Sequence, residues 1–252
     1  MQERITLPTS DGHTIYGTWD AASESERKSD SYSLRDTRRS LIIFVHGLTG
    51  NMYEHHYFNA VPFFTSRGFD TFRFNLYSAH DEARQLSECS ISIHTEDLTT
   101  VIDFFMDQYQ YEHMFLVGHS LGAPVILNTD LHSIKKIVLW DPTRGMKNLE
   151  EKGCYYHKGL GNYVLEWGLD ILLNQEMIND WKKAADIPSQ IKKIIKPCKL
   201  IFAQKCDIHE HWQPFLKDIK VPYESVIIPG ATHGFNQEGV EERLFQETLA
   251  WL

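Results

Sequence analysis

The sequence predicts an α/β fold with a doubly wound, mostly parallel β-sheet, and three observations support that prediction. Short, continuous apolar runs recur along the chain, as in strands that are buried on both faces of a parallel sheet. Amphipathic segments with helical spacing lie between these runs, and alternation of strand and helix is typical of a doubly wound sheet. The chain has 252 residues and is 42% hydrophobic, which is enough for one large domain with a substantial core.

The expected elements follow in chain order. Residues 4–20 predict two strands joined by a turn at Asp11-Gly12, a strong hairpin signal. Residues 21–40 are rich in serine and charge, and we expect an exposed loop there. Apolar runs predict further strands at residues 41–47, 70–76, 114–120, 136–142, 199–207 and 223–229. Apolar residues at helical spacing predict helices at residues 94–109 and 240–252.

Composition narrows the classes of partner and location. The formal net charge is −9 and the sequence has no basic stripe, so nucleic acid is not expected as a partner. No apolar stretch approaches the roughly 18 residues that span a membrane, and the first ten residues lack the apolar region of a signal peptide. The four cysteines show no metal-ligand or redox spacing. These features predict a cytoplasmic protein with reduced thiols.

One interval interrupts the alternation of strands and helices. Residues 143–197 contain no convincing buried strand, and an insertion of that length between two core strands predicts a helical cap or lid. The expected domains are therefore a core of residues 1–142 and 198–252 and a cap of residues 143–197. Leu165, Leu169 and Leu172 would form one apolar helix face in this cap. The alternative is a pair of helices that only pack on the core.

The aromatic residues of the cap are candidates for lining a substrate pocket. They are Tyr155, Tyr156, Tyr163 and Trp167. If the cap covers a reactive site, the pocket would be apolar and of limited length.

The segment "GHSLG", residues 118–122, fits the G-x-S-x-G motif of a nucleophile elbow. It ends an expected strand and opens an expected helix, which is the context that the motif requires. The glycines permit a sharp turn, and the turn lifts the hydroxyl of Ser120 above the sheet. The alternative is a serine in an ordinary strand-to-helix turn.

A serine needs a base, and the base needs an orienting acid. His233 is the best-placed base, because it lies between the last expected strand and the last expected helix. Asp207 ends the preceding strand and is the preferred acid, since loops at the carboxyl ends of strands meet at one edge of the sheet. Glu210 and Asp141 are alternative acids. The chain order Ser120, Asp207, His233 is the order described for this motif.

An oxyanion hole is expected from two backbone N–H groups. The run "FVHGLTG" ends a strand with an exposed turn, where the N–H of Leu48 would point at the substrate. The N–H of Leu121, next to Ser120, is the second donor. The alternative is that His46-Gly47 forms a plain turn.

The segments "HGLTGN", "GHSLGA" and "ATHGF", with an aspartate after the penultimate strand, resemble the α/β-hydrolase superfamily over nearly the whole chain. Within it the chain is similar to small cinnamoyl esterases and to the monoglyceride-lipase and serine-aminopeptidase-like group. The resemblance implies an eight-stranded sheet with an antiparallel second strand and a cap after the sixth. It also implies that Ser120, Asp207 and His233 form the triad, with Leu48 and Leu121 as oxyanion donors.

One segment departs from this family's pattern. Members often have Asp-x-Arg-Gly-x-Gly after the strand that follows the oxyanion loop, whereas this chain has "FNLYSAHDEAR". The side chains of Tyr77 and His80 are expected at the pocket wall instead. This region and the "GLGNYVLEWG" segment also resemble bacterial acyl-carrier thioesterases of the same fold.

Three functions follow from these residues. The first is a serine hydrolase of small to medium acyl or aromatic carboxylic esters, acting through an acyl-enzyme. The second is an acyl thioesterase or acyltransferase with the same triad, and the third is a non-catalytic binding member of the fold. No cofactor or metal is expected, and His209 to His211 and Glu54 to His56 are weak metal candidates. The expected partner is a small-molecule ester or thioester, and a homodimer is left open.

Overall fold

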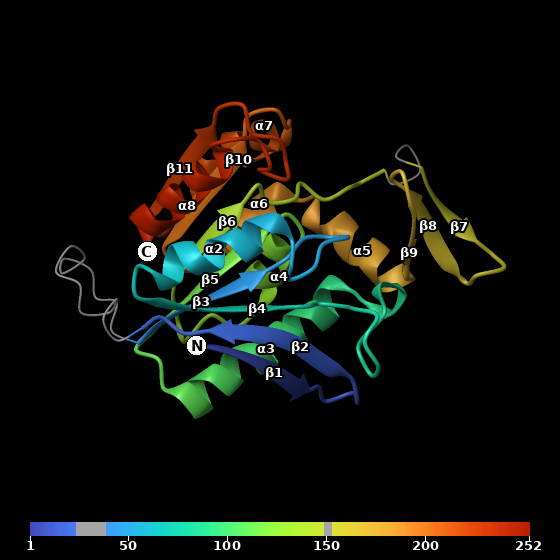
Figure 1. Cartoon of the computed structure of the whole chain (residues 1–252). Coiled ribbons are helices and arrows are strands. Elements are labelled where there is room, and N and C mark those ends of the chain that lie inside the picture. The colour runs from blue at the N-terminus through green and yellow to red at the C-terminus, as the bar shows by residue number, and fades with distance from the viewer. Residues whose placement is uncertain (24–38, 149–152) are drawn as a thin grey trace.

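Eight strands form one twisted sheet in the computed structural model, which describes residues 1–23, 39–148 and 153–252 (Figure 1). The order across the sheet is β1-β2-β4-β3-β5-β6-β10-β11. The strands are β1 (Gln2–Pro8), β2 (Thr14–Asp20), β3 (Ser40–Val45), β4 (Phe69–Phe74), β5 (His113–His119), β6 (Ile134–Trp140), β10 (Cys198–Ala203) and β11 (Tyr223–Ile228).

The sheet is parallel except at one strand. β2 pairs antiparallel with both β1 and β4, whereas the pairs from β4 to β11 are all parallel. Gly12 has a φ of +90° in the turn between β1 and β2, which only glycine adopts readily. The hairpin, the mostly parallel sheet and the antiparallel second strand are confirmed. The loop expected at residues 21–40 falls mainly on residues 24–38, which lie outside the described residues.

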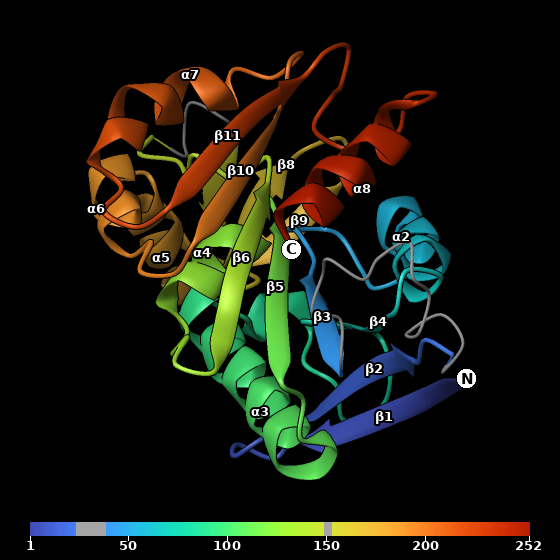
Figure 2. The same ribbon diagram turned by 90° about the vertical axis from the view of Figure 1, so that its left-hand side faces the viewer.

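Helices cover both faces of the sheet, as Figure 2 shows. α2 (His55–Thr65) and α8 (Val240–Trp251) pack on one face, while α3 (Ile91–Tyr109) and α4 (Gly122–Asn128) pack on the other. Shorter helical turns are η2 (Leu86–Glu88), α7 (Ile208–Trp212) and η4 (Gln213–Asp218). No helix among the described residues is long and apolar enough to cross a membrane.

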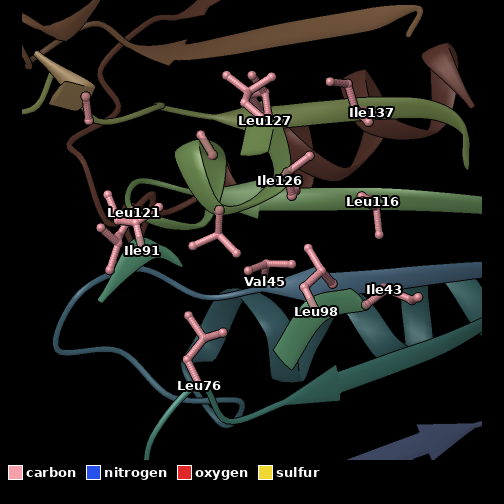
Figure 3. Close-up of a cluster of buried hydrophobic side chains, with 14 of the residues drawn as sticks. Ile43, Val45, Leu76, Ile91, Leu98, Leu116, Leu121, Ile126, Leu127 and Ile137 are labelled. Carbon is pink, nitrogen blue, oxygen red and sulfur yellow. The ribbon is translucent and has the colours of Figure 1, made fainter. Parts of the chain in front are cut away.

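The central strands are buried on both faces because each helical layer needs an apolar surface. In β3, Ile43 and Val45 face the α3 and α4 layer, and Ile42 and Phe44 face the α2 and α8 layer. Figure 3 shows the first of these clusters, where Ile43 and Val45 lie among side chains of β5, α3 and α4. This two-sided packing explains the continuous apolar runs in the sequence.

The inserted segment, residues 143–197, differs from the predicted helical cap. It contains a separate antiparallel sheet of β7 (Cys154–His157), β8 (Asn162–Glu166) and β9 (Asp170–Leu173), followed by α5 (Gln175–Ala184) and α6 (Ile187–Lys192). Figure 1 shows β7 and β8 at one end of the molecule, away from the large sheet. The prediction of a helical cap is therefore wrong for its first part and holds only for α5 and α6.

The three leucines assigned to one helix face lie in different elements. Leu165 is buried in β8, Leu172 lies in β9, and Leu169 is 78% exposed in the turn between these strands. Gly168, in the same turn, has a φ of +78°, which lets the chain reverse there. The spacing that predicted a helix arises here from a β-hairpin.

Candidate active site

Ser120 occupies a strained turn between β5 and α4. Its φ is +51°, a left-handed conformation that is uncommon for residues other than glycine. Its backbone N–H donates to the carbonyl of Trp140 at 3.0 Å, and its own carbonyl accepts from Thr143 at 3.1 Å. These hydrogen bonds hold the strained residue in place beside the end of β6.

The two glycines of the motif allow β5 and α4 to pass very close to their neighbours. A Cβ at Gly122 would lie 2.2 Å from the carbonyl oxygen of Val45, and one at Gly118 would lie 2.8 Å from Gly122. Both distances are too short for real atoms, so any larger residue would push α4 off the sheet. The geometry is that of the nucleophile elbow expected from the sequence.

His233 follows β11 and is held at two points. Its Nδ1–H donates to Oδ2 of Asp141 at 2.5 Å, and its backbone carbonyl accepts from Nε2 of His119 at 2.8 Å. Its side chain is 40% exposed, so it also reaches the surface of the site. Because Nδ1 carries the proton that the carboxylate accepts, the other nitrogen, Nε2, has its lone pair free.

Asp141 is fully buried directly after β6 and has a φ of +42°. Its backbone N–H donates to Ile201 at 2.7 Å, and its Oδ1 accepts from the N–H of Ala203 at 3.1 Å. β10 thereby fixes one carboxylate oxygen, and the other, Oδ2, is directed to His233. A buried carboxylate with these partners is suited to hold an imidazole in one tautomer.

Asp207 does not take the place that the sequence suggested. Its side chain is 55% exposed and forms an ion pair with Arg144 at 3.2 Å, while His233 is bound to Asp141. Glu210 is exposed and also makes no hydrogen bond to His233 among the described residues. The prediction that Asp207 orients His233 is wrong for this structure, because the Asp207 side chain lies in solvent at the start of α7 and the Asp141 side chain is buried against His233.

Ser120 and His233 open into one cleft of about 760 Å³. Leu48 and Leu121 line it beside them, so both expected oxyanion residues lie at the site. The other described lining residues are Thr49, Thr143, Arg144, Gly145, Met146, Trp167, Trp181, Lys205, Cys206, Asp207 and Ile208. A second hollow of about 520 Å³ shares Arg144, Gly145 and Met146 with this cleft.

Only one of the six residues predicted for the substrate pocket lines this cleft, and Tyr156 and His80 are outside its described lining. Trp167 is the one that lines it, 47% exposed, with its ring 5.5 Å from that of Trp181. Tyr77 instead donates to the carbonyl of Gly47 at 3.3 Å and supports the oxyanion loop from behind. Tyr155 lies on the outer strand β7, and Tyr163 donates to Gln175. The last three are not among the described lining residues.

Several buried histidines support the site without facing the cleft. His46 accepts from the N–H of Leu76 through Nε2 and contacts the carbonyl of Gly47 through Nδ1, and burial lowers its pKa to about 4. Burial lowers the pKa of His56 to about 3, and its ring lies 5.0 Å from that of His119. Burial likewise places the pKa of His119 well below the ordinary value. These rings are therefore neutral at pH 7 and act as packed hydrogen-bonding groups.

The candidate metal ligands of the sequence have other partners in the structure. His209 contacts the carbonyl of Cys206, and His211 contacts Arg144. His55 pairs with Glu241 at 2.6 Å. Within the described residues, Asp141, Cys206 and His233 are the group whose ligand atoms all lie within 4.8 Å of one another. Sequence spacing missed this group, because its members come from three distant segments.

Comparisons with known proteins bear on the fold. A family model described as the alpha/beta hydrolase fold matches residues 40–153. Est1E from Butyrivibrio proteoclasticus, solved with ferulic acid bound, has a TM-score of 0.75 and 17% identity, and the match covers 98% of each chain. No curated protein sequence matches the chain.

Two further structures are similar over nearly their whole length. Dienelactone hydrolase from Anabaena variabilis has a TM-score of 0.69 and 13% identity, and the match covers 100% of this chain and 96% of that one. Alpha/beta hydrolase domain-containing protein 10 from mouse has a TM-score of 0.67 and 17% identity, with 98% and 97% covered. The chain thus has the α/β-hydrolase fold. Esterases are among the solved structures that share this fold.

Proposed function

We propose that the chain is a serine hydrolase of carboxylic esters, with Ser120 as nucleophile, His233 as base and Asp141 as the orienting acid. The observation that carries the proposal is the hydrogen bond from His233 to the buried Asp141 beside the strained turn of Ser120. The α/β-hydrolase fold and the esterases among the similar structures support a hydrolase. The three residues keep the chain order Ser…Asp…His that belongs to this motif.

The proposed reaction follows from the tautomer of His233. Nδ1–H stays with Asp141, so Nε2 takes the proton of the Ser120 hydroxyl while the oxygen attacks the acyl carbon. The N–H groups of Leu48 and Leu121 are proposed to stabilise the oxyanion, and removing one such donor typically costs about 2.7–4 kcal/mol. The protonated imidazole then protonates the leaving alcohol, and water hydrolyses the acyl-enzyme by the same route.

The cleft favours uncharged, apolar acyl groups near the serine. Met146, Trp167, Trp181 and Ile208 supply apolar surface around Ser120 and His233. Ferulic acid, which is bound in the Est1E structure, is an aromatic acid, and this supports including aromatic esters among the proposed substrates. Because Trp167 and Trp181 belong to the inserted segment, we assign residues 143–197 the role of a cap over a core of residues 1–142 and 198–252.

A thioester is the second candidate substrate, and one observation favours it. Lys205 brings positive charge to the cleft, and Arg144 lines it in an ion pair with Asp207, although the chain as a whole carries a net charge of −9. The neighbouring hollow beyond Met146 adds Lys147 and extends the groove. An extended, phosphate-bearing leaving group suits these features. A panel of matched esters and thioesters with the same acyl chain separates the two candidates.

Ser120→Ala tests the proposed nucleophile. We expect at least about a 10³-fold loss in kcat on p-nitrophenyl esters, since triad residues act as a unit, and loss of labelling by a fluorophosphonate probe. Ser66→Ala is the matched control, because Ser66 is exposed at the end of α2 and does not line the cleft. A Ser120→Ala protein that is folded and keeps near-normal turnover would overturn the proposal.

A further inference from the structure

Cys206 lies at the acid–base pair, although the proposed reaction gives it no role. It follows β10 in a turn closed by its own N–H, which donates to Ala203 at 3.3 Å. Its half-buried thiol lies within 4.8 Å of the Asp141 carboxylate and of the His233 imidazole, and it lines the cleft. The thiol is thus positioned by the same strand end that positions Asp141.

Cys206, His233 and Asp141 together offer a thiol sulfur, an imidazole nitrogen and a carboxylate oxygen within 4.8 Å of one another. This is the ligand set that Zn²⁺ prefers, because Zn²⁺ is borderline soft and accepts sulfur, nitrogen and oxygen donors in four-coordinate sites. Oδ1 of Asp141 is held by Ala203, which leaves Oδ2 for a metal. Cys206 and His233 both border the cleft, so a fourth position is open to water.

We propose that Asp141, Cys206 and His233 form an inhibitory site for Zn²⁺ and closely similar divalent ions. The inhibition by the ion rests on the proposed function, whereas the binding of the ion does not. Binding releases the thiol proton to solvent, and Zn²⁺ with one thiolate, one carboxylate and one neutral imidazole carries no net charge. A neutral complex suits a site where one ligand is fully buried.

The inhibition follows from the position of one proton. A metal on Nδ1 of His233 displaces the hydrogen bond to Asp141 and moves the ring proton to Nε2. The nitrogen that would accept the proton of Ser120 then has no free lone pair. One ion therefore removes the base and occupies the acid in a single step, while Ser120 stays unmodified.

The site needs only a small rearrangement to close around an ion. Ligands at about 2.0–2.2 Å from a tetrahedral Zn²⁺ lie about 3.3 Å apart, whereas Nδ1 of His233 and Oδ2 of Asp141 are now 2.5 Å apart. The His233 ring must move outward by roughly the difference, and its side chain is 40% exposed and free to do so. Asp141 is the rigid member of the site.

Direct binding tests the site without any activity measurement. The full chain, freed of metal with a chelator, is titrated with Zn²⁺ by calorimetry and with Co²⁺ by absorption. We expect one ion per chain and a thiolate-to-cobalt charge-transfer band. Cys206→Ser should lose the band and bind Zn²⁺ at least about tenfold more weakly. His211→Gln is the matched control, because His211 lines only the adjoining hollow and should bind like the wild type.

Inhibition is measured with each variant compared to its own metal-free rate. Zn²⁺ should inhibit the wild type and His211→Gln reversibly, with recovery on adding chelator, and should inhibit Cys206→Ser at least about tenfold less strongly. Equal binding and equal inhibition in wild type and Cys206→Ser would overturn the site. Ser120→Ala should still bind Zn²⁺, so a chain that binds the ion through Cys206 but hydrolyses no ester contradicts the proposed function and keeps the metal site.

Discussion

Asp141 and Asp207 follow neighbouring parallel strands, yet their surroundings are opposite. Asp141, after β6, is fully buried and accepts hydrogen bonds from Ala203 and His233. Asp207, after β10, is 55% exposed and pairs with Arg144. The difference shows that a position at the end of a strand brings a carboxylate to the edge of the sheet where the histidine lies. The turn after the strand then decides whether that carboxylate points to the histidine or to solvent.

The two carboxylates also differ in how much free energy their interactions contribute. The Asp141 carboxylate is shielded from water, so removing its charge leaves Nδ1 of His233 without its ionic partner. The Asp207 pair with Arg144 is a partly exposed ion pair, and such pairs contribute about 0–1 kcal/mol.

Asp141→Asn should produce the largest effect. An amide in place of the carboxylate favours the wrong tautomer of His233, and the equivalent change in a Ser-His-Asp triad lowers kcat about 10⁴-fold. Steady-state kinetics on a p-nitrophenyl ester measures the loss, and circular dichroism checks the fold. If Asp207→Asn caused this loss and Asp141→Asn did not, the assignment of the acid would be reversed.

Low pH should lower the free energy of unfolding, because several buried histidines are neutral in the folded chain. Burial lowers the pKa of His46, His56 and His94 from about 6.5 to about 4, 3 and 3. Between pH 6.5 and 4 the unfolded chain therefore binds more protons at these rings than the folded chain does. The free energy of unfolding consequently decreases as the pH is lowered. Each ring contributes up to about 1.4 kcal/mol per pH unit.

Two carboxyl groups offset part of this effect. Burial raises the pKa of Glu54 and of Asp97, so these groups bind protons more readily in the folded chain. The net loss should be at least about 1.4 kcal/mol per pH unit below pH 6, measured by urea denaturation at pH 7, 6 and 5.5. Asp207→Asn should show the same slope as the wild type, and equal stability at pH 7 and 5.5 would contradict the prediction.

Trp167→Ala should change the order in which the protein prefers different esters. Trp167 is half-exposed and lines the cleft, so its loss should alter the order of esters in kcat/KM roughly five- to tenfold with little change in Tm. Leu169→Ala is the matched control, since Leu169 is 78% exposed in the same turn and is outside the described lining. An unchanged ranking together with a large fall in Tm would place Trp167 in a packing role.

Asp207→Asn should produce the smallest effect. We expect kcat/KM on neutral esters to stay within about threefold of the wild type, because the exposed pair with Arg144 is worth little. Anionic esters should bind slightly better, since one negative charge at the cleft is removed. A loss beyond about tenfold on neutral esters would show that the exposed carboxylate takes part in the chemistry.

The sequence supported the sheet and the elbow because both depend on local patterns. Strands buried on two faces need continuous apolar runs, and the close contacts at Gly118 and Gly122 require glycine. The acid could not be chosen in this way. Asp141 and Asp207 both follow apolar runs and both precede His233. Only the φ of +42° at Asp141 and the hydrogen bond from the N–H of Ala203 turn the Asp141 side chain inward.

The inserted segment was misassigned because its spacing fits two structures. Leucines at 165, 169 and 172 match a helix face, but they also match two short strands joined by a tight turn. Gly161 and Gly168 both have a positive φ and lie in the turns between β7 and β8 and between β8 and β9. These two glycines are the sequence feature that indicates hairpins here. Tyr77 was misplaced for a different reason, since its ring packs on His46 behind the oxyanion loop, a contact that sequence does not encode locally.

The order in which a ribosome makes this chain has a consequence for its reactivity. Ser120 emerges with the central strands, but Asp141 is oriented by Ile201 and Ala203 of β10, and His233 comes after β11. A nascent chain that ends within the inserted segment contains Ser120 and Asp141. It still lacks β10, which orients Asp141, and His233, the proposed base for Ser120. The proposed nucleophile therefore has no base during most of translation. It is activated only when the last two strands have joined the sheet.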